Sequence, residues 1–235
     1  MKRVLITFAI LILSGCVTST SREQNDTTTQ LEQNYKIANN HLALIDLYKE
    51  QLTLDVNNAS ILYKLANSYY TIGDNYSAKF YLSKIEGERT TQSDVLLLSA
   101  QIDVKETRYN EALDKLESIS ASGQQNKQVY MLYGIIYSHL EEYRLAVEHF
   151  NESRLYGGND EEVKNNISVV YISQGNYSKA TDMLVDLLKF NPDNEKAKFN
   201  LAIVKIKERK FGDAARILGD DFSENDISII FNYSE

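Results

Sequence analysis

The stretch Gly175-Asn176-Tyr177-Ser178-Lys179-Ala180 decides the fold, because its first and last positions recur along the chain at one fixed spacing. The residues that share the first position, which we take as a turn, are Gly73, Thr107, Glu141, Gly175 and Arg209. Five residues later comes an alanine each time, and successive alanines are 34 residues apart: Ala78, Ala112, Ala146, Ala180 and Ala214. A fixed period of roughly 20–50 residues is typical of a solenoid, in which one supersecondary unit stacks on the next.

Two further positions of each 34-residue unit keep their character. Seven residues before the turn lies a small residue, namely Ala66, Ala100, Gly134, Ser168 and Ala202. Four residues after the alanine lies a large apolar residue, namely Leu82, Leu116, Phe150, Leu184 and Leu218. Small residues let two antiparallel helices approach closely, and large ones fill the layer between them, since protein interiors are close-packed. An ordinary bundle with alanine-rich crossings is the alternative, but this shared register favours the repeat.

This pattern resembles the tetratricopeptide motif, whose period is also about 34 residues. The resemblance implies an all-α, right-handed superhelical solenoid of about six helix-turn-helix repeats. We expect the repeats at 25–58, 59–92, 93–126, 127–160, 161–194 and 195–228. The first is degenerate, since Leu44 replaces the alanine, and a terminal repeat can depart from the pattern because it packs on one side only.

The amino-terminal residues read as a processing and anchoring segment. Lys2 and Arg3 precede an apolar stretch over residues 4–13, which is too short to span a bilayer that needs about 20 residues. We therefore expect a lipoprotein signal peptide over residues 1–15. Leu13-Ser14-Gly15-Cys16 resembles the bacterial lipobox, which implies lipid attachment at Cys16, the only cysteine of the chain. The alternative is an ordinary signal peptide with a chance cysteine.

The remaining segments complete the expected domain plan. Residues 16–28, which comprise the lipidated cysteine and a Ser/Thr-rich stretch, are expected to form a flexible tether. The repeat domain follows over residues 29–228, and residues 229–235 form a carboxy-terminal tail or cap. Val17 directly after the lipidated cysteine resembles the pattern that sorts lipoproteins to the outer membrane.

Composition excludes several functions. The chain has 25 Lys and Arg against 33 Asp and Glu, a formal net charge of −8, which argues against nucleic-acid binding. The three histidines are dispersed, and no second cysteine exists to complete a zinc site. We therefore expect no catalytic residues, no metal and no cofactor, and we interpret the chain as a binding protein and not an enzyme.

The first helix of each repeat is expected to line a concave groove, through roughly positions 2, 5, 9 and 12 of the repeat. The candidate partner-binding residues are Tyr63, Asn67, Tyr70, Met131, Ile135, Asn165, Val169, Ile172, Phe199 and Ile203. Because the later repeats supply apolar residues, the groove suits a protein or peptide partner. Two alternatives stay open: residues 222–233 fold back over the late groove as a cap, or Ile203 or Ile206 belongs to the core.

The last part of the chain carries a narrower resemblance. The segments Asn200-Leu201-Ala202, Lys210-Phe211 and Asp221-Phe222-Ser223-Glu224 look like the closing part of the TadD-like repeat lipoproteins of the tight-adherence (Flp) pilus system. The resemblance implies a lipid-anchored, periplasm-facing, pilotin-like adaptor at the outer membrane that binds the pilus secretin or another pilus assembly component. The alternatives are a type IV pilus pilotin, a subunit of the outer-membrane β-barrel assembly machine, a cell-wall hydrolase adaptor, or a periplasmic ligand-binding accessory protein.

Overall fold

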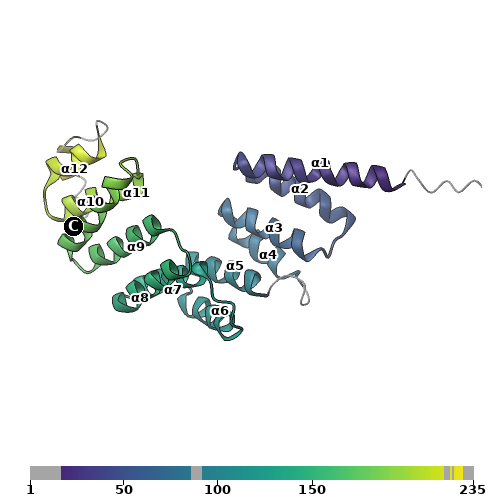
Figure 1. Cartoon of the computed structure of the whole chain (residues 1–235), viewed down its shortest axis with the longest axis horizontal. Coiled ribbons are helices and arrows are strands. Elements are labelled where there is room, and N and C mark those ends of the chain that lie inside the picture. Colours follow the sequence, from purple (N-terminus) through teal and green to yellow (C-terminus); the bar gives the residue numbers. More distant parts are fainter. Residues whose placement is uncertain (1–16, 86–91, 220–222, 224, 230–235) are drawn as a thin grey trace, which may run out of the picture. The chain divides into compact units, whose positions relative to one another are not determined.

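The computed structural model describes residues 17–85, 92–219, 223 and 225–229, and all of their regular secondary structure is helical (Figure 1). The chain divides into two compact units at residues 91 and 92. The first unit contains α1 (Val17–Ile37), α2 (His41–Leu54), α3 (Ala59–Thr71) and α4 (Asn75–Leu82). The second unit contains α5 (Gln92–Lys105), α6 (Tyr109–Ala121), α7 (Lys127–His139), α8 (Tyr143–Leu155), α9 (Asp160–Ser173), α10 (Tyr177–Phe190), α11 (Glu195–Lys207) and α12 (Phe211–Leu218), followed by a helical turn at 225–229.

These helices pair as the 34-residue period predicts, with one helix on each side of every predicted turn. Two repeats, α1–α2 and α3–α4, form the first unit, and four repeats, α5–α6 to α11–α12, form the second. The core of each unit lies between the helices of one repeat and the first helix of the next. One such cluster joins Ala146 and Phe150 of α8 to Val163, Ile167 and Val170 of α9. The predicted helix-turn-helix repeats are therefore confirmed.

The turn within each repeat depends on one residue with a positive φ angle. These residues are Asn39 (49°), Gly73 (85°), Thr107 (59°), Glu141 (61°), Gly175 (71°) and Arg209 (58°), each 34 positions from the next. The predicted turn positions are thus confirmed, and Asn39 extends the register to the degenerate first repeat. The left-handed conformation costs a residue with a Cβ atom roughly 1–2 kcal/mol, so the four turns without glycine are strained.

Thr107 is the most unfavourable of the four because its side chain is β-branched, and we expect Thr107→Gly to raise the free energy of unfolding by about 1 kcal/mol. Chemical denaturation would measure the change. Gly175→Thr is the matched reverse substitution, since φ is 71° there and an added Cβ would meet nothing within 4 Å. It should lower stability by a similar amount, and changes of the same sign in both variants would contradict this explanation.

The first repeat differs from the others at the helix crossing. Glu32 of α1 occupies the position that Ala66 holds in the next repeat, and it accepts hydrogen bonds from Lys36 at 2.5 Å and Lys64 at 3.0 Å. Burial raises the pKa of Glu32, but the two lysines outweigh that effect and hold the pKa below its ordinary value. In the first repeat, a carboxylate paired with lysines therefore occupies the crossing where the other repeats have a small side chain.

The structure differs from the sequence-based expectation at the amino-terminal side of this repeat. A flexible tether was expected over residues 16–28, whereas α1 is one continuous helix from Val17. Composition alone misses this because a helix that has already formed in a packed segment extends easily. Each added residue loses its own backbone entropy and gains one hydrogen bond, so the polar residues before the segment can continue the helix. The expected signal peptide and Cys16 lie outside the described residues. No helix in the described part of the chain is both long and apolar enough to cross a membrane.

At the other end, the described part of the carboxy-terminal segment packs onto the last repeat. Ile227 is buried against Ala202 of α11 and Ala214 of α12, and Ile206 is partly buried beside them. The alternative of a carboxy-terminal cap is therefore supported for residues 225–229, and so is the assignment of Ile206 to the core. Residues 222, 224 and 230–233 of the predicted capping segment lie outside the described residues.

His149 of α8 lies among three tyrosine rings of α7. The ring centroids of Tyr130, Tyr133 and Tyr137 are 6.1, 4.9 and 5.2 Å from that of His149. The Nδ1 atom of His149 is buried and has no hydrogen-bond partner. Burial lowers the pKa of His149 below its ordinary value, because a proton would charge a ring that has lost its water.

This environment predicts a loss of stability on acidification. The unfolded chain takes up a proton at His149 below about pH 6.5, while the folded chain resists it until a lower pH, so the free energy of unfolding falls over that interval. We expect His149→Phe to lose less stability than the wild type between pH 7 and pH 5 in denaturant titrations. His139→Phe is the control at an exposed position, and an identical pH dependence in wild type and His149→Phe would contradict the prediction.

Candidate partner-binding groove

Helix α9 of the second unit borders two neighbouring cavities. One has a volume of about 270 Å³ and is bordered by α7, α8 and α9 through Ile135, Ser138, His139, Phe150, Asn166, Val169 and Ser173. The other has a volume of about 340 Å³ and is bordered by the first turns of α9 and α11 through Asn159, Glu161, Glu162, Asn165, Asn166, Asn194 and Lys196. Asn166 borders both, so the two cavities adjoin each other, and together we call them the α9 groove.

Asparagine caps fix the polar end of the α9 groove. Asn159 accepts a hydrogen bond from the backbone N–H of Glu162 at 2.9 Å, and Asn194 accepts one from that of Ala197 at 3.0 Å. The side-chain amides of Asn191 and Asn194 each donate to one carboxylate oxygen of Glu161 at 3.0 Å. Side-chain caps of this kind begin helices firmly, so the border of the cavity is preorganised.

Side-chain amides also form the middle of the α9 groove. Asn200 donates to the Oδ1 atom of Asn165 at 2.8 Å, and Asn166 donates to the sulfur of Met131 at 3.1 Å. Among the described residues, these bonds leave the Asn165 amide N–H groups and the Asn166 Oδ1 atom without a partner. One amide donor and one amide acceptor are therefore available to a ligand between the two cavities.

The structure brings four of the ten predicted groove residues together. Ile135 and Val169 line the apolar cavity, Asn165 lines the polar one, and Met131 contacts Asn166 between them. The others are placed as follows: Ile172 packs against the core of α10 and α11, Phe199 of α11 is 60% exposed, Ile203 is partly buried and lines neither cavity, and Tyr63, Asn67 and Tyr70 belong to α3 in the first unit.

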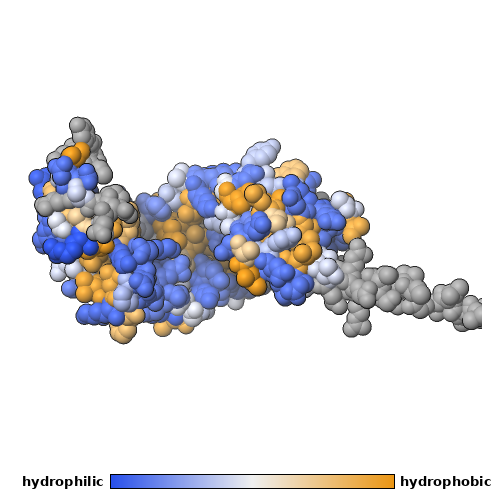
Figure 2. Space-filling model, turned by 90° about the horizontal axis from the view of Figure 1, so that it is seen from above, coloured by the Kyte–Doolittle hydropathy of each residue, from blue (hydrophilic) through white to orange (hydrophobic). Residues whose placement is uncertain are grey.

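Several groove residues were not predicted from the sequence. Asn166 lies one position after a predicted residue, and its equivalent one repeat later is Asn200, so a recurring amide was the signal that could have found it. Phe150 was assigned only to the core, which is correct for its 1% exposure, yet its ring also borders the apolar cavity. On the face drawn in Figure 2, hydrophobic residues occur in several patches between hydrophilic ones.

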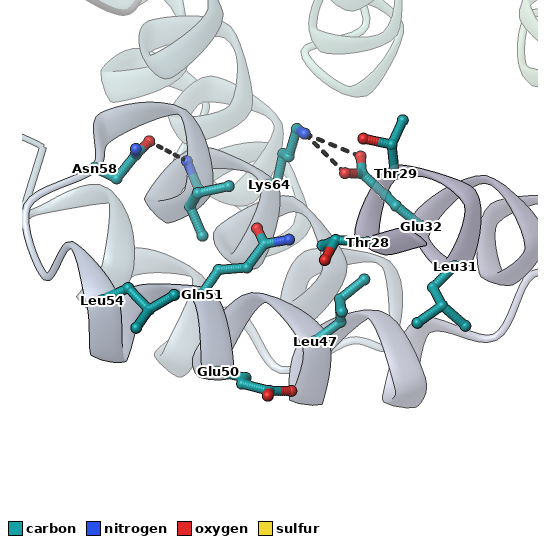
Figure 3. A pocket seen from close by; sticks show the side chains of 11 residues that line it. Thr28, Thr29, Leu31, Glu32, Leu47, Glu50, Gln51, Leu54, Asn58 and Lys64 are labelled. Carbon is teal, nitrogen blue, oxygen red and sulfur yellow. Dashed lines mark hydrogen bonds and ion pairs between the residues drawn. The ribbon is translucent and has the colours of Figure 1, made fainter. Parts of the chain in front are cut away.

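The first unit contains a third cavity, of about 620 Å³, that was not predicted (Figure 3). It lies among α1, α2 and α3, and its lining includes Leu31, Leu47 and the ion pair of Glu32 with Lys64. The Oε1 atom of Gln51, which also lines it, is buried without a partner. The cavity follows from Glu32 at the helix crossing, where a small residue would let the helices close.

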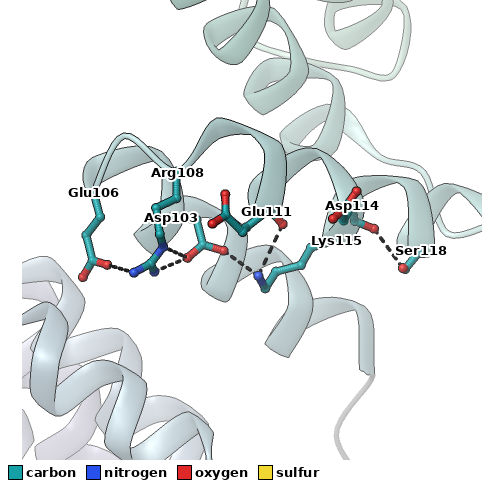
Figure 4. A network of polar contacts seen from close by, with 7 residues as sticks. All are labelled: Asp103, Glu106, Arg108, Glu111, Asp114, Lys115 and Ser118. Carbon is teal, nitrogen blue, oxygen red and sulfur yellow. Dashed lines mark hydrogen bonds and ion pairs between the residues drawn. The ribbon is translucent and has the colours of Figure 1, made fainter.

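The most buried charge cluster stabilises the fold and lines none of these cavities. Asp103 of α5 is 4% exposed, and Figure 4 shows Arg108 and Lys115 converging on its carboxylate. The Nε atom of Arg108 lies 3.0 Å from one oxygen, and Nζ of Lys115 lies 2.5 Å from the other. No group of three or more metal-ligating side chains occurs in the part of the chain that the structure describes.

Stacked helix-turn-helix units with turns every 34 residues define an all-α helical-repeat fold. No protein-family model and no curated protein matches the sequence. A tetratricopeptide repeat protein from Parabacteroides merdae superposes with a TM-score of 0.69 at 15% identity, over 87% of this chain and 82% of that one.

Two other solved structures are similar. The APC/C hetero-tetramer Cut9-Hcn1 has a TM-score of 0.65 at 16% identity over 86% of this chain, which spans only 39% of that one. YrrB, described as a TPR protein with an unusual peptide-binding site, has a TM-score of 0.50 at 16% identity, over 73% of this chain and 88% of that one. Because the sequence identities are this low, the comparisons bear on the fold alone. The structural similarity confirms the predicted all-α tetratricopeptide-repeat solenoid.

Proposed function

We propose that this protein is a non-enzymatic adaptor that binds an extended segment of a partner protein in the α9 groove. The observation that carries the proposal is the order of sites along α9: a cavity with a wall of Ile135, Phe150 and Val169, then an amide donor and acceptor that have no partner among the described residues, and then a polar cavity. An extended peptide presents backbone N–H and C=O groups between side chains, which is the pattern that this order of sites complements. The peptide-binding site described for YrrB, a protein of the same fold, agrees with this mode.

We further propose that the adaptor lies on the periplasmic face of the outer membrane and assists the assembly of the Flp pilus secretin. Its support is the lipobox-like Leu13-Ser14-Gly15-Cys16 and the resemblance of the last residues to TadD-like lipoproteins. Lipid at Cys16 would anchor the protein stably if more than one acyl chain were attached, since a single chain binds membranes only marginally. The secretin or a pilus subunit bound to it would supply the extended segment.

Deletion of the gene is the first test. We expect secretin multimers to disappear from the outer-membrane fraction and pili to be lost, and unchanged multimers with unchanged piliation would refute the pilus role. Complementation separates the groove from the rest of the protein. Val169 of α9 and Val185 of α10 are both 37% exposed, but only Val169 lines the groove. Val185→Arg should restore assembly and Val169→Arg should not, because its guanidinium would fill the apolar cavity.

Cys16→Ser tests the anchor. Without the thiol no diacylglyceryl group can be attached, so we expect the protein to move from the membrane pellet to the soluble periplasmic fraction. The wild type carries the lipid and should remain with the outer membrane after carbonate or high-salt washing, since acyl chains and not charges hold it there. A Cys16→Ser variant that still sedimented with membranes would contradict lipid anchoring.

A further inference from the structure

We infer that the α9 groove selects an extended segment in which an apolar residue and a lysine or arginine are separated by one residue. This inference rests on the proposed function and specifies the chemistry of the partner. It is built from the two ends of the groove and from the spacing that Asn166 sets between them.

The apolar end accepts one uncharged side chain. Phe150 borders the cavity, Ile135 and Val169 flank it, and no carboxylate, lysine or arginine lines it. Its volume of about 270 Å³ lies below the ~300–1,000 Å³ typical of pockets that enclose a whole small ligand. A single aliphatic side chain such as leucine or valine therefore suits the wall of Ile135, Phe150 and Val169, and the other lining residues, Ser138, His139, Asn166 and Ser173, include no carboxylate to pair with a lysine or arginine.

The middle of the groove can form hydrogen bonds with the backbone of a bound peptide. The free Oδ1 atom of Asn166 can accept from a peptide N–H, and the free amide of Asn165 can donate to a peptide carbonyl. Asn166 borders both cavities, so they are immediate neighbours. In an extended chain, side chains two residues apart point to the same side about 7 Å from each other. One intervening residue is therefore the shortest spacing at which an extended segment can direct two side chains towards neighbouring cavities.

The polar end carries an excess of negative charge. The two segments that border it, 159–162 and 193–198, contain five carboxylates and two ammonium groups. Asp160 already pairs with Arg154 and Lys164, and Glu195 pairs with Lys198. This leaves Glu161, Glu162 and Asp193, of which Glu161 and Glu162 line the cavity together with the single ammonium group of Lys196.

An anionic ligand has little to gain at this end, although two helices begin there. Helix N-termini bind anions through free backbone N–H groups. Here Asn159 and Asn194 already occupy N–H groups in the first turns of α9 and α11. Glu161 is held by two neutral amides, which fix its carboxylate without cancelling its charge. A cationic side chain is therefore the complementary ligand.

Fluorescence anisotropy with labelled heptapeptides and the purified full chain tests the inference. The probes are Gly-Ser-Leu-Ser-Lys-Ser-Gly, the same peptide with glutamate or serine in place of lysine, and the reversed order Lys-Ser-Leu for the opposite chain direction. We expect one of the two lysine peptides to bind about fivefold more tightly than the glutamate peptide, with a preference that weakens at high salt, because the ion pair is partly exposed to solvent.

Two variants separate the inference from the function on which it rests. Glu162→Gln should remove most of the preference for lysine and leave the affinity for the serine peptide unchanged. Val169→Arg should abolish binding of every peptide, whereas Val185→Arg should not. Equal binding of the lysine and glutamate peptides would overturn the preference for a basic residue, but peptide binding in the groove would still stand. If no leucine peptide bound, or if Val169→Arg had no effect, the groove itself would be refuted.

Discussion

Gly134→Ala is expected to lower the free energy of unfolding by about 2 kcal/mol, although alanine is ordinarily the better helix former by about 1 kcal/mol. A Cβ atom at this position would lie 2.5 Å from two atoms of the Phe150 ring and 2.9 Å from a third. Phe150 is 1% exposed, so its ring can make room only by leaving its core contacts with α9 and moving towards the cavity that it borders. Denaturant unfolding of the purified variant would measure the loss.

The other repeats show how this clash is relieved. The second, third, fifth and sixth repeats combine a residue larger than glycine with leucine at the two equivalent positions, as in Ala66 with Leu82 and Ala100 with Leu116. We therefore expect Gly134→Ala with Phe150→Leu to be more stable than the sum of the single changes by at least 1 kcal/mol, which a double-mutant cycle would measure. Additive single effects would show that the two residues do not share one space.

Asp103→Ala is expected to cost about 2 kcal/mol, because a hydrogen bond to a charged group contributes roughly 1.5–3 kcal/mol. The carboxylate holds Arg108 and Lys115, whose side chains are 37% and 30% exposed. Both cations can therefore turn to water after the substitution, which keeps the cost below that of a wholly buried broken pair. Thermal or denaturant unfolding would show the change.

Asp114→Ala is the matched control for this prediction. Asp114 lies on the neighbouring helix α6 and is exposed, and only its backbone carbonyl accepts a hydrogen bond, from Ser118. Its replacement should change stability by less than about 0.5 kcal/mol. Equal losses for the two aspartates would mean that the ion pairs of Asp103 contribute nothing beyond the loss of a surface charge.

The period predicted more of the fold than any single residue could. It placed five turns, and the structure adds a sixth in the same register at Asn39, in the repeat whose alanine is missing, because every turn needs a left-handed residue whatever its side chain. It failed where a side chain departs from the repeat. Glu32 at a position reserved for small residues opens a cavity under α1, and no rule of spacing measures such a gap.

The groove was predicted only in part, because the period gives positions along the chain and not the contacts that side chains make. Register alone identifies the groove-facing side of a first helix, and it led to Ile135, Asn165 and Val169, although Asn165 is only 9% exposed. It could not show that Asn165 bonds to Asn200, or that Ile172 packs into the core of the next repeat, because both depend on contacts between repeats. Asn166 was missed since its side chain reaches the groove from a position adjacent to the predicted one.

Site-specific photocrosslinking in living cells tests the proposed binding groove most directly. A photoreactive phenylalanine analogue would replace Val169 in the α9 groove or Val185 on α10, two valines of equal 37% exposure. If a partner segment occupies the groove, irradiation yields a defined adduct from position 169, absent from position 185, which antibodies identify as the secretin or a pilus component. No adduct at position 169, or the same adducts at both positions, would contradict partner binding in the α9 groove.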